Sequence, residues 1–163
     1  MTDSQRTQYH VLSIACRQLL PEPLFSNTSS SQIIMDRPSF EKIVIKSLRR
    51  LPGKFRKRLR HLIIDIEDQP PQELLDDMGI LSGTLFGLYQ GIPLPEREWN
   101  YGNALPDRII IYQKAIERAA SSNYEIEEIV LDTVVHEIGH YFGFDDDTLN
   151  SIEEEKKKKK TGK

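Results

Sequence analysis

Apolar residues recur at helical spacing in two segments of the chain, and each segment predicts an amphipathic helix. The first helix should begin with Ser39 as its N-terminal cap, because a serine hydroxyl can accept a hydrogen bond from a free amide of the first turn. Its apolar face comprises Phe40, Ile43, Val44, Leu48 and Leu51. The second helix should cover residues 125–142, and its buried stripe comprises Ile126, Ile129, Val130, Thr133 and Val134.

Three shorter runs predict strands, at residues 62–66, 84–90 and 108–112. The run Arg108–Tyr112 is the clearest, and its unbroken β-branched stretch suits burial on both faces, or an inner strand beside a substrate-binding edge. Short helices are expected at residues 54–60, 71–78, 115–120 and 147–155, with a loop or weak extended segment at 96–106. These elements predict an α+β fold in which helices bracket a small mixed sheet.

The end of the second long helix carries a motif of the form H-E-x-x-H-x-x-G-x-x-D, from His136 to Asp146. Residues four apart on a helix are separated by about 40° around the axis and about 6 Å along it, so His136 and His140 can face one ion. Glu137 can flank that ion and accept a proton from water. Gly143 can adopt the left-handed conformation that ends a helix, which returns Asp146 toward the ion as a candidate third ligand. This set suits Zn²⁺ in a catalytic site, where the fourth position is left for water.

Other interpretations of the motif stay open. The helix could simply carry two solvent-facing histidines before an ordinary glycine stop. Asp145 and Asp147 could replace Asp146 as the ligand, although the spacing favours Asp146. The acidic run Glu153–Glu155 precedes a run of lysines, which indicates a solvated helix end rather than a ligand.

Residues outside the motif offer little further chemistry. Three tyrosines could stabilise an oxyanion, but packing or surface roles are commoner for this residue and none is assigned. These tyrosines are Tyr101, Tyr112 and Tyr141. His10 and His61 read as ordinary histidines.

From about Arg37 to Asn150 the sequence resembles the small bacterial zincin-like metallopeptidases, the minimal zincin family. The matching segments are Phe40-Glu41-Lys42, Leu51-Pro52, Ile66 through Pro71, Leu85 through Leu94, Leu105 through Tyr112, and Val135 through Asp146. The resemblance implies a compact α+β zincin fold, with His136, His140 and Asp146 as zinc ligands and Glu137 as general base. It implies a reaction class, the hydrolysis of peptide bonds, without identifying a target.

The motif differs from the patterns of three neighbouring classes of protein. Metzincins place a histidine at the position of Asp146 and have a methionine turn beneath the zinc, whereas all three methionines here lie upstream of the motif. The bacterial endoribonucleases of ribosomal RNA maturation have the same ligand spacing but lack the glutamate that follows the first histidine. Glu137 therefore favours a peptidase over a metal-dependent endoribonuclease-like hydrolase. Glu137 and the open coordination position also argue against a non-catalytic, zinc-stabilised interaction module.

We therefore interpret the chain as a zinc-dependent metallopeptidase. Zinc and Glu137 would activate the hydrolytic water, and Glu137 would pass its proton to the leaving amine. The substrate is expected to be a peptide or protein that adds to the sheet beside the Arg108–Tyr112 strand by β-augmentation.

The length of 163 residues suits one domain, which we place at residues 35–150. Residues 1–34 read as a leader or disordered extension, because Pro21 and Pro23 precede the Ser-rich stretch Ser26–Ser31. Residues 151–163 read as a charged, lysine-rich tail. No apolar run approaches the roughly 20 residues that span a bilayer, and the single cysteine, Cys16, suits the reducing cytoplasm.

The charge distribution adds one candidate surface. The formal net charge of −3 predicts no partner by itself. The segment of residues 42–60 contains nine lysines and arginines and no acid. A solvated helix face is the favoured interpretation, and a surface for RNA or an acidic protein is the alternative.

Overall fold

The computed structural model describes residues 33–59, 62–81, 83–97 and 106–161. The predicted N-terminal extension lies almost wholly outside these ranges, as do His10, His61 and Tyr101. The helices and strands are, in chain order, α1 (Arg37–Arg50), α2 (Gly53–Arg56), β1 (Leu62–Glu67), α3 (Gln72–Asp77), β2 (Gly87–Gln90), the 3-10 helix η1 (Leu94–Glu96), β3 (Asp107–Tyr112), α4 (Gln113–Ala119), α5 (Asn123–Tyr141) and α6 (Asp146–Thr161).

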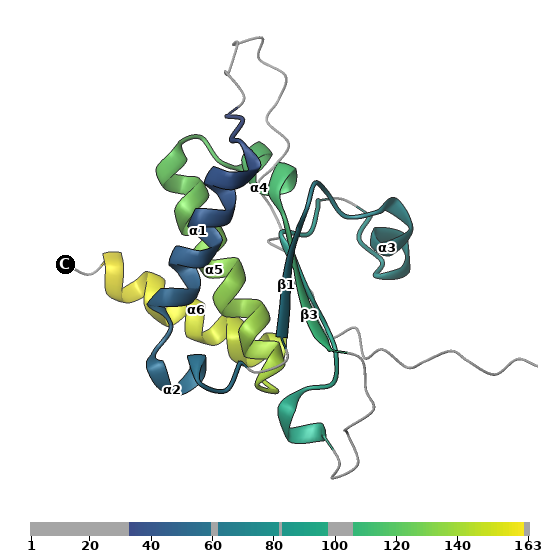
Figure 1. Cartoon of the computed structure of the whole chain (residues 1–163), viewed down its shortest axis with the longest axis vertical. Coiled ribbons are helices and arrows are strands. Elements are labelled where there is room, and N and C mark those ends of the chain that lie inside the picture. Colours follow the sequence, from purple (N-terminus) through teal and green to yellow (C-terminus); the bar gives the residue numbers. More distant parts are fainter. Residues whose placement is uncertain (1–32, 60–61, 82, 98–105, 162–163) are drawn as a thin grey trace, which may run out of the picture.

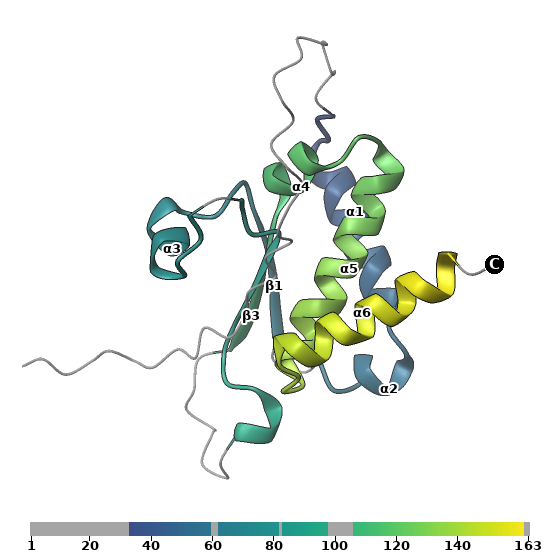
Figure 2. The same ribbon diagram turned by 180° about the vertical axis from the view of Figure 1, so that it is seen from behind.

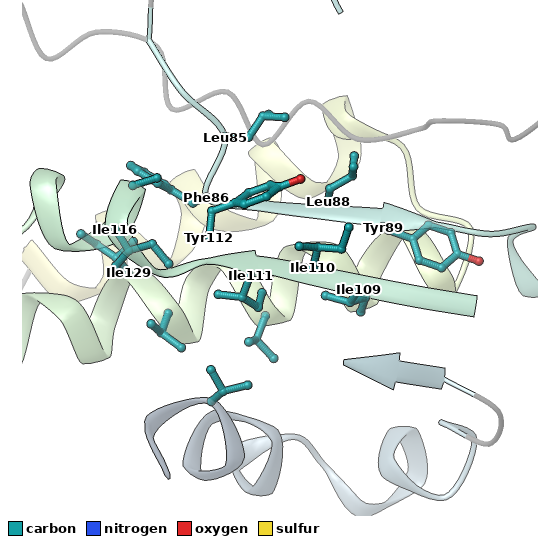
Figure 3. Close-up of a cluster of buried hydrophobic side chains, with 14 of the residues drawn as sticks. Leu85, Phe86, Leu88, Tyr89, Ile109, Ile110, Ile111, Tyr112, Ile116 and Ile129 are labelled. Carbon is teal, nitrogen blue, oxygen red and sulfur yellow. The ribbon is translucent and has the colours of Figure 1, made fainter. Parts of the chain in front are cut away.

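The described strands form one three-stranded mixed sheet in the order β1-β3-β2. β1 pairs with β3 in parallel, and β2 pairs with β3 in antiparallel fashion, with Gly87 opposite Ile111. Successive side chains of β3 point to opposite faces, and Figure 3 shows Ile109 and Ile111 on one side and Ile110 on the other. All three are buried, so the predicted two-sided burial of this strand is confirmed.

Helices α1, α5 and α6 lie on one side of the sheet and α3 lies on the other (Figures 1 and 2). α1 packs on α5, and α5 also contacts β2 and β3. The two predicted apolar stripes meet in the core, where Phe40, Val44, Ile126 and Val130 are among the most buried residues. The α+β architecture predicted from the sequence is therefore confirmed. Within the described ranges no helix has the length and hydrophobicity needed to span a bilayer.

The start of α1 differs from the prediction. Asp36, rather than Ser39, is the N-terminal cap, and its carboxylate accepts a hydrogen bond from the Ser39 amide at 3.2 Å. The reason lies in Pro38, which has no amide hydrogen and a backbone angle that suits a first helical turn. The helix therefore begins before the proline, and Ser39 becomes the donor at the cap.

Three other elements differ in length from the prediction. The strand expected at residues 84–90 covers only Gly87–Gln90, and the helix expected at residues 54–60 covers only Gly53–Arg56. The last helix, by contrast, continues through the lysine run to Thr161, so α6 spans the boundary that we placed after residue 150.

The position of β3 corrects the expectation for substrate binding. β3 is the central strand and pairs on both sides, so a peptide cannot add beside it. β2 is the strand at the edge of the described sheet on the side that contacts α5. Both β2 and β3 contact α5, but of these two strands only β2 lies at an edge of the described sheet.

Candidate metal centre

Helix α5 brings His136, Glu137 and His140 together at its C-terminal end. Ser122 caps the start of this helix by accepting a hydrogen bond from the Glu125 amide at 3.1 Å. All three side chains of the motif are buried, with exposures of 5% for His136, 0% for Glu137 and 1% for His140. Buried polar groups on a helix need partners, so this concentration indicates a built site rather than a solvent-facing surface.

The turn after α5 returns the chain to the histidines. Gly143 has φ +89°, the left-handed conformation predicted for it. Its amide donates to the His140 carbonyl at 2.9 Å, and the Phe144 amide donates to the Gly139 carbonyl at 3.1 Å, which satisfies the end of the helix. Asp146 then opens α6 beside the two imidazoles.

His136, His140 and Asp146 offer three ligand atoms that all lie within 4.8 Å of one another. The nearest oxygen of Asp146, Oδ1, is 3.3 Å from Nε2 of His136 and 3.3 Å from Nε2 of His140. Two ligands of a tetrahedral zinc ion at the usual bond lengths are separated by about 3.3 Å. The spacing of these atoms therefore fits a zinc ion among them.

His140 provides the strictest test of that fit. Its Nδ1 lies 3.0 Å from the Phe144 carbonyl oxygen, which can only accept, so Nδ1 carries the proton and Nε2 presents a lone pair. Nε2 is buried without a hydrogen-bond partner and faces Asp146, whose carboxylate oxygens also only accept. A cation between these acceptors would satisfy both atoms, which is the chemistry expected of a metal centre.

The two histidines differ in their surroundings. Burial lowers the pKa of His140, and the neighbouring His136 lowers it further. Burial also opposes protonation of His136, but hydrogen bonding to Glu153 and the charge of Glu137 outweigh it, so the pKa of His136 lies above its ordinary value. The centre is thus rich in negative charge, as a cation site requires.

Glu153 is the residue of this centre that the sequence analysis missed. Its Oε1 lies 3.1 Å from Nδ1 of His136, so the interpretation of Glu153 as part of a solvated helix end was wrong. Glu154 and Glu155 are exposed, as expected of that helix end. The sequence did contain an indication that Glu153 lies at this centre, because Asp146, Leu149 and Glu153 are spaced so that they fall on one face of a helix.

Gly139 permits the close approach of α6 to α5. A β-carbon at this position would lie 2.4 Å from Cδ2 of Leu149, which is buried against the helix. The second variable residue of the motif is therefore small because α6 crosses there, and this contact fixes both Asp146 and Glu153 relative to the histidines.

Tyr112 and Tyr141 are the oxyanion candidates that lie within the described residues, and both are buried. The Tyr141 hydroxyl donates to the Arg58 carbonyl at 2.9 Å, which is a packing role. Tyr112 is buried at the end of β3, and burial raises its pKa to about 12.

A buried hydrogen-bond network around Asp107 lies next to the segment that packs against the Gly143 turn. Asp107 receives hydrogen bonds from Tyr89 at 2.8 Å and from Arg97 at 2.6 Å, and Arg97 also lies over the Tyr141 ring. Arg97 ends the short segment that contains η1, and Pro95 of η1 packs against the Gly143 turn. This network had no signature in the sequence, because strand pairing and packing, rather than a local motif, bring its members together.

A match to one family profile agrees with this geometry. The family profile described as "Zincin-like metallopeptidase" matches residues 59–156. Among curated proteins, none matches the chain. A conserved hypothetical protein from Thermus thermophilus has a similar structure, with a TM-score of 0.47 and 19% sequence identity, covering 65% of this chain and 92% of that one.

Proposed function

The chain belongs to the zincin-like metallopeptidase family, and on that premise we propose that it is a zinc-dependent peptidase that hydrolyses peptide bonds. The observation that carries the proposal is the buried Nε2 of His140, a lone pair without a hydrogen-bond partner that faces the Asp146 carboxylate. His136, His140 and Asp146 would hold the metal. Zinc, when bound, would supply Lewis acidity at the water and at the scissile carbonyl.

Glu137 is the proposed general base. It follows the first histidine directly and is fully buried, and it is not one of the three clustered residues, so it would offer a proton acceptor close to a bound metal without serving as a ligand. Glu137 would take a proton from water and deliver it to the leaving amine. Removal of such a base costs roughly 10²- to 10⁴-fold in rate.

The substrate is proposed to bind as an extended peptide along β2. This strand lies at the edge of the described sheet and offers backbone hydrogen-bonding groups to an added strand. β2 also runs directly past the proposed base, because a β-carbon on Gly87 would lie 2.9 Å from Cγ of Glu137. A peptide on this edge would therefore lie close to the base, and its main chain rather than a side-chain pocket would supply most of the binding.

We place this activity in a reducing compartment such as the cytoplasm, because Cys16 has no second cysteine with which to form a disulfide within the chain.

The test compares the wild-type chain with Glu137→Gln for zinc content and for cleavage of casein and of a quenched peptide library. The glutamine variant should keep about one zinc per chain and lose at least 100-fold in hydrolysis, because the change removes a base and not a ligand. Full activity in Glu137→Gln would show that the general base is wrongly assigned. Zinc-dependent cleavage of RNA without any cleavage of peptides would replace the peptidase with the endoribonuclease-like alternative.

A further inference from the structure

Helix α6 presents two carboxylates to the two ring nitrogens of one histidine. Asp146 Oδ1 lies 3.3 Å from Nε2 of His136, and Glu153 Oε1 lies 3.1 Å from Nδ1 of the same ring. The two acidic residues are seven positions apart on α6, close to two helical turns, so they share a face of the helix. The contact is sheltered, because the Glu153 side chain is 28% exposed and the His136 side chain 5%.

Only one of these carboxylates belongs to the ligand cluster. The atoms that could surround a metal come from His136, His140 and Asp146, and Glu153 is outside this group. Glu153 instead meets the ring nitrogen that points away from the cluster. A neutral imidazole that offers Nε2 to a metal must carry its proton on Nδ1, and an ionised carboxylate can accept a hydrogen bond from that proton.

The second histidine has the same arrangement with a different acceptor. Nδ1 of His140 donates to the Phe144 carbonyl, which is part of the turn between α5 and α6. The backbone thus orients His140, while a side chain two turns into the next helix orients His136. Hydrogen bonds of this kind set the tautomer and the ring orientation of a metal-binding histidine.

The packing of α6 on α5 holds Glu153 in place. Leu149 lies between Asp146 and Glu153 on the same helix face and packs against Gly139. Asp145 caps the start of the helix by accepting a hydrogen bond from the Thr148 amide at 2.9 Å. The Leu149 contact and the Asp145 cap therefore hold the part of α6 that contains Glu153 against α5.

From these contacts we infer that Glu153 is a positioning residue of the metal centre, which fixes His136 with its proton on Nδ1 and its Nε2 lone pair toward the metal. This inference rests on the proposed zinc function. It assigns to α6 a role that neither the motif nor the family description contains, because α6 supplies both a ligand and the group that orients another ligand.

The experiment uses the full chain as wild type, Glu153→Ala, Glu153→Gln and the control Glu154→Ala. Glu154 is a matched neighbour on the same helix; its side chain is 71% exposed and forms an ion pair with Lys158 at 4.0 Å. Zinc affinity is measured by competition with a chromophoric chelator, and thermal unfolding checks that each variant folds. Proton NMR of the zinc-loaded chain records the exchangeable Nδ1 protons of both histidines, with His140 as the internal reference. Ring ¹⁵N shifts of His136 are recorded in the metal-free chain.

Glu153→Ala should lower zinc affinity ten- to a hundredfold and lose the His136 Nδ1 proton signal to exchange, while the His140 signal remains. Glu153→Gln keeps an oxygen acceptor and should retain the signal with a smaller loss of affinity. Glu154→Ala should match the wild type in both measurements. The inference is overturned if Glu153→Ala behaves like Glu154→Ala. It is also overturned if Glu153→Gln loses zinc as fully as Glu153→Ala while the His136 signal persists, because Glu153 would then be a ligand.

The metal-free spectra separate this inference from the proposed function. They require neither zinc binding nor hydrolysis, and Glu153→Ala should shift the His136 ring nitrogens where Glu154→Ala does not. A wild-type chain that binds no zinc would refute the peptidase proposal, and these spectra would still decide whether Glu153 orients His136. Identical ring nitrogen shifts in the wild type and Glu153→Ala would refute the contact itself.

Discussion

Leu149 of α6 packs directly on Gly139 of α5, where a β-carbon would lie 2.4 Å from Cδ2 and 3.0 Å from Cδ1 of the leucine. Gly139 occupies the last position before His140, so the crossing point of the two helices lies within the metal motif. Any change in that contact moves the helix that carries Asp146 and Glu153.

Gly139→Ala should therefore destabilise the chain and weaken zinc binding. Alanine favours a helix by about 1 kcal/mol over glycine, but overpacking of a core contact costs about 1–3 kcal/mol, so we expect a net loss of about 1 kcal/mol. Thermal unfolding and chelator competition measure the two effects.

Gly53→Ala is the control, because a β-carbon there meets nothing within 4 Å, and it should be neutral or slightly stabilising. Adding Leu149→Ala to Gly139→Ala should restore part of the zinc affinity. Equal behaviour of the two glycine variants would show that the crossing is not tight.

Asp146→Ala should weaken zinc affinity far more than the same change at Asp145 or Asp147. Asp146 places a carboxylate oxygen 3.3 Å from each of the two histidine Nε2 atoms. Asp145 is instead the cap of α6, and its hydrogen bond with Thr148 lowers the pKa of its carboxyl, so Asp145→Ala should reduce helix stability and leave a functional centre. Zinc titration of the three variants measures the difference. A zinc-loaded structure with Asp145 or Asp147 on the metal would refute this assignment.

The sequence predicted those helices and strands in which apolar residues follow a regular spacing or a continuous run. The 3/4 spacing of Ile126, Ile129 and Val130 was sufficient for α5, and the apolar run of residues 109–111 was sufficient for β3. The metal cluster also followed, because helical geometry and one glycine determine where His136, His140 and Asp146 meet.

The remaining features depend on contacts between distant segments, which periodicity does not encode. The position of β2 at the sheet edge depends on strand pairing, and pairing is not fixed by chain order. The contact of Glu153 with His136 depends on how α6 crosses α5, which the Gly139 contact determines. The N-terminal cap of α1 was misassigned because two nearby polar residues, Asp36 and Ser39, both satisfy the local rule and Pro38 decides between them.

The basic face of α1 should bind RNA weakly or not at all. Lys42, Lys46, Arg49 and Arg50 are exposed, whereas Ile43 and Val44 on the same helix are buried. Lys46 already pairs with Glu127 at 2.6 Å, so part of this charge is balanced within the molecule. RNA retention on a filter at low and moderate salt measures the interaction. Strong retention that falls steeply with salt, and that is lost on replacing Arg49 and Arg50 with serine, would instead establish a nucleic-acid surface.

Arg97→Met should destabilise the chain by about 3 kcal/mol and lower zinc affinity, because it removes the cation beside a buried carboxylate. The pair of Arg97 and Asp107 has side-chain exposures of 15% and 1%, and Arg97 also anchors the segment that packs on the Gly143 turn. Arg108→Met is the matched control, since Arg108 pairs with Asp65 and Glu67 at exposures near 40% and should cost less than about 1 kcal/mol. Chemical denaturation gives the free energies of unfolding, and chelator competition gives zinc affinities for both variants. The expected order is a large loss in both quantities for Arg97→Met and little change for Arg108→Met. A reversed order would mean that the buried network stabilises neither the domain nor the turn that carries Asp146.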